Sequence, residues 1–114
     1  MAVTKYDISI PQGSTYSLVV TVAGGPADLT GYIADMQIRQ IKSSPVVLAD
    51  VTSDNFEVDP VNRQVALELT DEETSLYDWS HPAVYDIYIE GPAGDRWRLI
   101  EGVANLNKTV TREA

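Results

Sequence analysis

The sequence contains no cysteine, a single histidine and few basic residues. Without cysteine the chain has no disulfide framework, no thiol nucleophile and no thiolate ligand for a metal ion. Its 8 Lys and Arg are outnumbered by 17 Asp and Glu, which gives a formal net charge of −9. Nucleic-acid binding depends on cations that neutralise phosphates, so we expect neither nucleic acid nor an anionic membrane as a partner.

Long hydrophobic runs are also missing. No apolar stretch approaches the roughly 18 residues that a membrane-spanning helix requires. The first residues, Met1 to Asp7, contain no apolar segment behind a basic flank, so we expect no secretory leader. The 114 residues, 44% of them hydrophobic, predict one globular domain over residues 1–114.

Apolar and polar residues alternate from end to end of the chain, a pattern typical of half-buried strands. The glycine- and proline-rich segments 24–26 and 91–95 are predicted turns, and Gly102 is predicted to form a bulge or bend in the last strand. The pattern predicts an all-β fold, an antiparallel β-sandwich of about seven or eight strands, with a small barrel as the alternative. The predicted strands cover residues 5–10, 15–22, 32–40, 46–50, 56–58, 63–69, 83–90 and 96–106.

One segment departs from the alternation. Thr70 followed three residues later by Glu73 fits a capping box, and acidic residues suit the positive end of a helix. Pro82 leaves room only for one short helical turn near residues 71–78. We expect this turn to cross one end of the sandwich, with Leu76 and Trp79 against the edge of the core.

The sequence predicts no catalytic residue. His81 follows Ser80 and lies near Asp78, but adjacent side chains rarely face each other as a catalytic triad requires, and no G-x-S-x-G motif presents a serine. Glycine-rich phosphate loops are also lacking, so no cofactor is predicted.

No metal site is predicted either, although a structural Ca²⁺ held by carboxylates stays open. The two acidic clusters that bear on this question are Asp50, Asp54, Glu57 and Asp59, and Asp71, Glu72, Glu73 and Asp78.

Several short blocks lie in order between residues 12 and 112. The most specific is Asp-Leu-Thr-Gly-Tyr at residues 28–32, and the next is the Glu-Gly of residues 101–102 with Val-Thr-Arg at 110–112. With these blocks the sequence resembles a family of small tailed-bacteriophage structural proteins, and is similar to the immunoglobulin-like N-terminal domain of phage baseplate upper proteins. The other blocks are residues 12–16, 33–39, 65–69, 73–74, 85–87 and 99–100.

The resemblance implies an immunoglobulin-like β-sandwich that is a structural component of the virion and has no catalytic residues to carry over. We therefore expect a non-enzymatic assembly module of a tail, baseplate or fibre junction, made in the bacterial host cytoplasm and located in the virion. Its expected partners are other phage structural proteins, in a symmetric homo-oligomer. The alternatives are a capsid decoration protein and a small carbohydrate-binding module that contacts a host surface glycan.

Inter-subunit contacts are expected from the first strand and from the tail after Leu106, because terminal segments and sheet edges are natural sites of pairing between chains. Among the aromatic residues, Tyr88 is the one for which alternation predicts surface exposure. The candidate interface residues are Tyr6, Ile8, Ile10, Tyr88, Val110 and Arg112.

Overall fold

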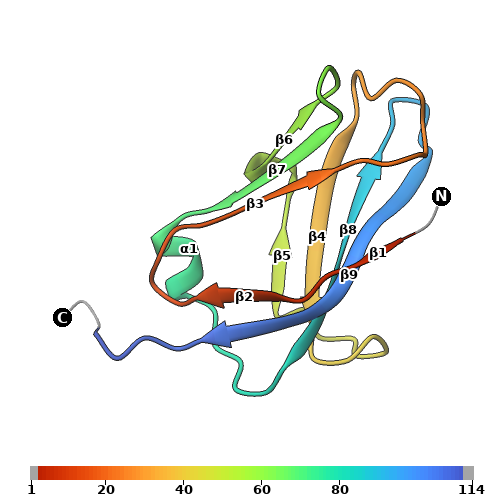
Figure 1. Ribbon diagram of the computed structural model, residues 1–114. Helices are drawn as coiled ribbons and strands as arrows, with labels where there is room; N and C mark the ends of the chain where they lie inside the picture. The colour runs from red at the N-terminus through yellow and green to blue at the C-terminus, as the bar shows by residue number, and fades with distance from the viewer. Residues whose placement is uncertain (1–2, 112–114) are drawn as a thin grey trace.

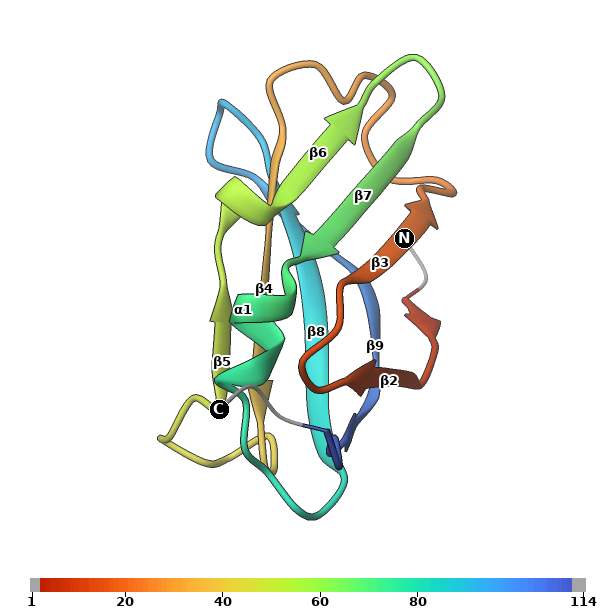
Figure 2. The ribbon, with the colours of Figure 1, turned by 90° about the vertical axis from the view of Figure 1, so that its left-hand side faces the viewer.

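The computed structural model describes residues 3–111, in which two β-sheets pack face to face around one apolar core (Figures 1 and 2). The larger sheet has the order β1-β9-β8-β4-β5, with β2 also paired to β9, and the smaller has the order β3-β7-β6. The strands are β1 (Thr4–Lys5), β2 (Ile8–Pro11), β3 (Tyr16–Thr21), β4 (Ile33–Arg39), β5 (Ala49–Val51), β6 (Phe56–Asp59), β7 (Gln64–Leu69), β8 (Ala83–Glu90) and β9 (Arg96–Asn107). Two short helices, η1 (Ser53–Asn55) and α1 (Asp71–Ser75), complete the chain, and neither is long or apolar enough to cross a membrane.

The prediction of an all-β sandwich is confirmed, and the strand order is that of an immunoglobulin-like domain. In that fold strands B, E and D form one sheet and strands G, F and C the other, extended by C′ in variable-type domains. The orders β3-β7-β6 and β9-β8-β4-β5 reproduce this arrangement. The described residues form nine strands rather than seven or eight, because the first predicted strand is divided into β1 and β2.

The core follows the predicted alternation closely. On β4 the side chains of Ala34, Met36 and Ile38 are buried, and on β7 those of Val65, Leu67 and Leu69 are buried. β5 is displaced from its predicted position at 46–50 to Ala49–Val51, and Val46 is 62% exposed in the preceding loop.

The prediction of an antiparallel sheet is wrong for the N-terminal segment, since β1 and β2 both run parallel to β9. Hydrogen bonds also join β9 to the two residues between β1 and β2. The Tyr6 amide donates to the Glu101 carbonyl (2.9 Å), and the Val103 amide donates to the Asp7 carboxylate (3.0 Å). The phenol of Tyr85 donates to the carbonyl of Tyr6 (2.5 Å), and burial raises the pKa of this phenol well above its usual value. The Tyr85 hydroxyl therefore remains a donor at physiological pH.

Gly102 does not form the predicted bulge. The register between β8 and β9 shifts at Leu99 instead, where Tyr88 pairs with Arg98 but Ile87 pairs with Ile100. A Cβ atom at position 102 would collide with the backbone carbonyl of Tyr6. The glycine is thus required for the close approach of the N-terminal segment to β9.

The capping box is confirmed, because the Thr70 hydroxyl accepts from the Glu73 amide (3.1 Å) and the Glu73 carboxylate accepts from the Thr70 amide (3.0 Å). The helix ends earlier than predicted, at Ser75, and Leu76 is 84% exposed rather than packed against the core. Trp79 does close the core edge: it is buried, and its indole Nε1 donates to the Ala104 carbonyl (3.1 Å).

Thr74 anchors α1 to the turn between β2 and β3, which explains why the helix turns Thr74 rather than Leu76 inward. The Thr74 side chain is fully buried. Its hydroxyl accepts from the Gly13 amide (3.0 Å) and donates to the Ser14 carbonyl (2.8 Å). A buried hydroxyl needs such partners, and an apolar side chain at this site would leave the Gly13 amide unsatisfied.

We predict that Gly102→Ala lowers the free energy of unfolding by about 1–3 kcal/mol, because the added methyl group forces β9 and the Tyr6 backbone apart. Urea denaturation measures the loss, and hydrogen exchange should show faster exchange of the Tyr6 amide. The control is Gly24→Ala, where the new Cβ meets nothing within 4 Å and only backbone strain is added. Unchanged Tyr6 exchange in Gly102→Ala would contradict the assignment.

Candidate functional site

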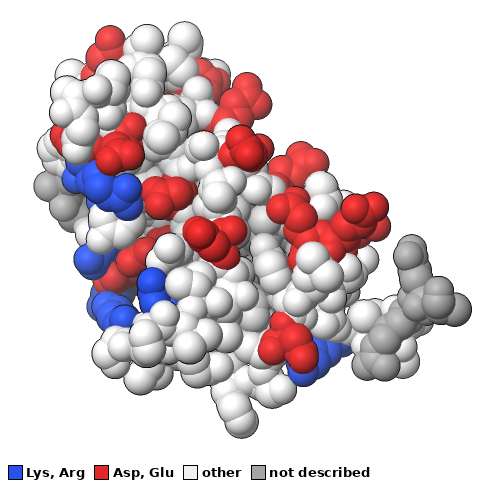
Figure 3. Space-filling model, turned by 180° about the vertical axis from the view of Figure 1, so that it is seen from behind, with Lys and Arg blue, Asp and Glu red and all other residues white. Residues whose placement is uncertain are grey.

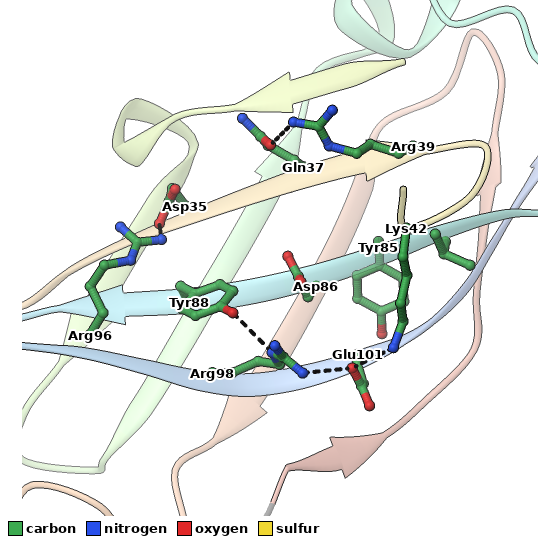
Figure 4. A pocket seen from close by; sticks show the side chains of 11 residues that line it. Asp35, Gln37, Arg39, Lys42, Tyr85, Asp86, Tyr88, Arg96, Arg98 and Glu101 are labelled. Carbon is green, nitrogen blue, oxygen red and sulfur yellow. Dashed lines mark hydrogen bonds and ion pairs between the residues drawn. The ribbon is translucent and has the colours of Figure 1, made fainter. Parts of the chain in front are cut away.

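A hollow on the described surface lies on the outer face of the larger sheet, over β4, β8 and β9 (Figure 4). Its volume is about 500 Å³, within the range of small ligand sites. We call it the sheet-face hollow. Its lining residues are Asp35, Gln37 and Arg39 of β4, Lys42 of the following loop, Val84, Tyr85, Asp86 and Tyr88 of β8, and Arg96, Arg98 and Glu101 of β9.

The bulge in β9 determines which side chains reach this face. Alternation turns Arg96 and Arg98 outward, and without a bulge it would turn Ile100 outward as well. Because Leu99 is the extra residue, both Leu99 and Ile100 are buried, and Glu101 takes the outward position. The guanidinium of Arg98 and the carboxylate of Glu101 are thereby brought to 3.2 Å from each other.

Tyr88 lies between two guanidinium groups. The Arg96 guanidinium carbon is 4.7 Å from the centre of the Tyr88 ring, and that of Arg98 is 5.5 Å from it. Arg98 Nε also donates to the Tyr88 hydroxyl (3.0 Å), as the dashed line in Figure 4 shows. Cation–π attraction and this hydrogen bond hold the two arginines over the hollow.

Most of the cations have carboxylate partners. Glu101 Oε2 accepts a hydrogen bond from Arg98 (3.2 Å) and forms an ion pair with Lys42 (3.5 Å). Arg96 is 3.5 Å from Asp35 and 3.9 Å from Glu90. The Arg96 pairs are solvent-exposed and contribute little to stability.

Arg39 differs from the other cations of the hollow, because its described partners are neutral. Its guanidinium donates to Gln37 Oε1 (2.9 Å) and to the Ser44 carbonyl (2.6 Å). Its positive charge is therefore not paired with a carboxylate in the described part of the chain.

Asp86 lies at the middle of the hollow, directly across from Glu101 on β9 and Gln37 on β4 (Figure 4). No hydrogen bond within residues 3–111 reaches its carboxylate. Partial burial raises the pKa of Asp86, the charges of Glu101 and Asp35 add to this, and Arg98 and Lys42 oppose it. Burial and like charges disfavour the ionised form, whereas the cations favour it.

The charges of the chain are unevenly distributed (Figure 3). The hollow contains 4 of the 8 basic residues but only 3 of the 17 acidic ones. In Figure 3 most of the visible cations gather on one side of the molecule, with carboxylates among them, and one further cation lies beside a carboxylate at the lower right. A chain with a net charge of −9 thus has one region whose formal charge is positive.

Sequence reasoning missed this convergence, because the basic residues are scattered along the chain. Arg39, Lys42, Arg96 and Arg98 meet only through the pairing of β4 with β8 and of β8 with β9. Alternation along the observed strands β4 and β9 turns Arg39, Arg96 and Arg98 outward. The signal that could have placed them together is the strand order of an immunoglobulin-like sheet, applied to those outward positions.

The candidate interface residues fall into different environments. The prediction that the side chains of Ile8 and Ile10 form an interface is wrong, because they are 3% and 0% exposed and belong to the core. β2 can offer a partner only its backbone edge. Tyr6 is 52% exposed and Val110 95% exposed, while Tyr88 lies half-buried in the sheet-face hollow. Arg112 lies outside the described residues.

The residues weighed for catalysis do not form a hydrogen-bonded triad within residues 3–111. The Lys108 ammonium donates to the Ser80 hydroxyl (3.1 Å) and pairs with the Asp78 carboxylate (2.7 Å), and this pairing lowers the pKa of Asp78. Within residues 3–111, no hydrogen bond joins Ser80 or Asp78 to the His81 ring. In the same part of the chain, no three His, Cys, Asp or Glu residues lie together in a group that could hold a metal ion.

The second exposed feature is the outer edge of β3, which we call the β3 edge. β3 pairs with β7 on one side and with no described strand on the other. In the immunoglobulin arrangement an N-terminal strand A lies at this position. Here both N-terminal strands pair with β9, so within residues 3–111 no strand covers the β3 edge.

We predict that Asp86→Asn raises the stability at neutral pH by at most about 1 kcal/mol, since water screens this partly exposed carboxylate. An Asp whose pKa is raised by folding loses stability as the pH rises from its unfolded pKa through its folded pKa. The gain from Asp86→Asn should therefore be absent at pH 3 and grow as the pH rises above about 4. Urea denaturation at several pH values tests this, with the exposed Asp54→Asn as the control for net charge; an equal gain in both variants would refute the role of burial.

No family model matches the chain, and no curated protein matches it by sequence. The fold is nevertheless an immunoglobulin-like sandwich by its strand order. Fold alone does not imply function, so functional inference depends on the sheet-face hollow and the β3 edge.

Proposed function

We propose that the chain is a non-enzymatic assembly module of a bacteriophage virion, which acts at a tail, baseplate or fibre junction through contacts with other structural proteins. The observation that carries this proposal is the β3 edge. It presents unpaired backbone N–H and C=O groups on which an extended segment of a neighbour can form an additional strand. In a symmetric assembly each copy offers the same edge, so one contact is repeated around the ring.

The β3 edge is the best suited of the sheet edges for pairing. Its six residues, Tyr16–Thr21, carry no charge and no proline, and Val19 is 58% exposed. The other edges are protected by the devices that proteins use against strand addition. β5 has only three residues, β6 carries two acidic residues and β2 ends in a proline.

The resemblance of the sequence blocks to small tailed-bacteriophage structural proteins supports the virion as the location. The net charge of −9 suits a protein that must stay soluble in the host cytoplasm before it assembles. A rigid sandwich without cysteine suits assembly in that reducing compartment.

The two alternatives have less support. A carbohydrate-binding module needs a platform of exposed aromatic rings, but guanidinium groups lie over the Tyr88 ring and Trp79 is buried. Among the described aromatic residues only Tyr6 is largely exposed, and one ring does not form such a platform. A capsid decoration protein would need the same kind of sandwich and the same solubility. Copy number per particle distinguishes it from a tail protein.

Quantitative mass spectrometry of purified particles, from the phage that encodes the chain, tests the proposal. A few copies to a few tens of copies per particle is the result that we expect of a tail, baseplate or fibre component. Hundreds of copies would assign the chain to the capsid shell. Absence from the particle would contradict a virion role altogether.

We further predict that Val19→Lys reduces incorporation into particles by at least about tenfold, because a charged side chain on an edge strand opposes pairing. Its folding should be nearly unaffected, since the site is exposed. The matched control is Val61→Lys, which makes the same chemical change at a site 88% exposed in the turn between β6 and β7. Equal incorporation of the two variants would show that the β3 edge is not used.

A further inference from the structure

We propose that the sheet-face hollow binds an acidic segment of a partner protein, with the segment's Asp or Glu side chains seated on the cations of the hollow. This inference rests on the proposed function only in taking the occupant to be a protein. It adds a second contact surface, on the sheet opposite the β3 edge, and specifies the chemistry of what it binds.

The first argument is the availability of Arg39. Its guanidinium is held over the hollow by two neutral oxygens, those of Gln37 and Ser44. An incoming carboxylate can replace such a contact with an ion pair, in which both the donor and the acceptor of the hydrogen bond are charged. The planar guanidinium also accepts a carboxylate in two parallel hydrogen bonds.

The second argument is that the other cations already bind carboxylates in exchangeable pairs. Arg96 and Asp35 have side chains 43% and 41% exposed and are 3.5 Å apart. Exposed pairs of this kind contribute little, so a partner's carboxylate can take Asp35's place at small cost. Arg98 remains anchored by the Tyr88 hydroxyl and by Glu101, which preserves the shape of the hollow.

The spacing of the cations specifies an extended segment. Asp86 lies at the middle and opposes an anion placed directly over it, so the carboxylates of the segment must lie toward the two ends (Figure 4). In the strand register Arg39 of β4 pairs with Val84 of β8, and Arg98 of β9 pairs with Tyr88 of β8, four residues further along that strand. Four residues along a strand span about 14 Å, and the two strands lie about 10 Å apart across the sheet, on either side of β8. Two acidic residues four positions apart in an extended chain cover the distance along the strands, and the long side chains of Arg and Glu cover the offset across them.

Charge outside the hollow argues against long polyanions. Beyond the lining residues the chain has 14 acidic residues and only 4 basic ones. A nucleic acid or a long acidic polysaccharide would extend past the four cations onto this negative surface and be repelled. A short acidic segment avoids that repulsion, and the guanidinium groups near the Tyr88 ring would compete with a sugar for stacking on it.

Fluorescence anisotropy with a labelled peptide tests the inference. The probe has two Glu residues four positions apart in a Ser- and Thr-rich segment, and its control has Gln at both positions. We expect saturable binding of the Glu peptide that weakens with added salt, and at least tenfold weaker binding of the Gln peptide. Failure of the Glu peptide to bind, or equal binding of the two peptides, would overturn the proposal.

A pair of charge-reversed variants locates the binding. Arg39→Glu with Arg98→Glu should weaken binding of the Glu peptide at least tenfold. Lys5→Glu with Lys108→Glu changes the net charge by the same amount outside the hollow and should leave binding unchanged. An equal loss in both double variants would overturn the proposal, and Arg39→Gln with Arg98→Gln replaces the first pair if thermal melting shows that it does not fold.

Competition and particle composition separate this inference from the proposed function. Tighter binding of inorganic phosphate or of a sulfated oligosaccharide than of the Glu peptide would overturn an acidic protein segment as the ligand. If the Glu peptide fails to bind but the chain is found in particles, only the role of the hollow is wrong. If the peptide binds at the hollow and the chain is missing from particles, the virion role is wrong.

Discussion

The backbone of Tyr6 lies against Gly102, and the rest of the surface architecture depends on this close approach. Only a residue without a Cβ atom at position 102 lets the N-terminal segment run along β9. The hydrogen bond from the Tyr85 hydroxyl to the Tyr6 carbonyl then fixes the segment from the neighbouring strand. Because the larger sheet takes both N-terminal strands, the smaller sheet receives none, and β3 is left as an open edge.

β9 connects the two candidate surfaces. On one side it holds the N-terminal segment and so leaves the β3 edge open, and on its outer face it supplies Arg96, Arg98 and Glu101 to the sheet-face hollow. The bulge at Leu99 allows both roles, since it turns Glu101 outward and keeps Ile100 in the core. The two surfaces lie on different sheets, so a neighbour can occupy one without covering the other.

Local chemistry made much of the fold predictable from the sequence. Alternation identified the buried faces of β4 and β7, and the capping box depends on two residues in one turn, Thr70 and Glu73. The features that escaped prediction depend on register between distant strands. Nothing near Gly102 in the sequence indicates that Tyr6 will lie against it, and Arg39 and Arg98 share a hollow only because β8 pairs with both of their strands.

The most direct test of this account compares hydrogen exchange of β3 in the isolated chain and in purified particles. The amides of Tyr16–Thr21 that do not donate to β7 should exchange freely in the isolated chain, because no strand covers that edge. In particles the same amides should become protected. Identical exchange of the β3 amides in the two states would contradict assembly through this edge.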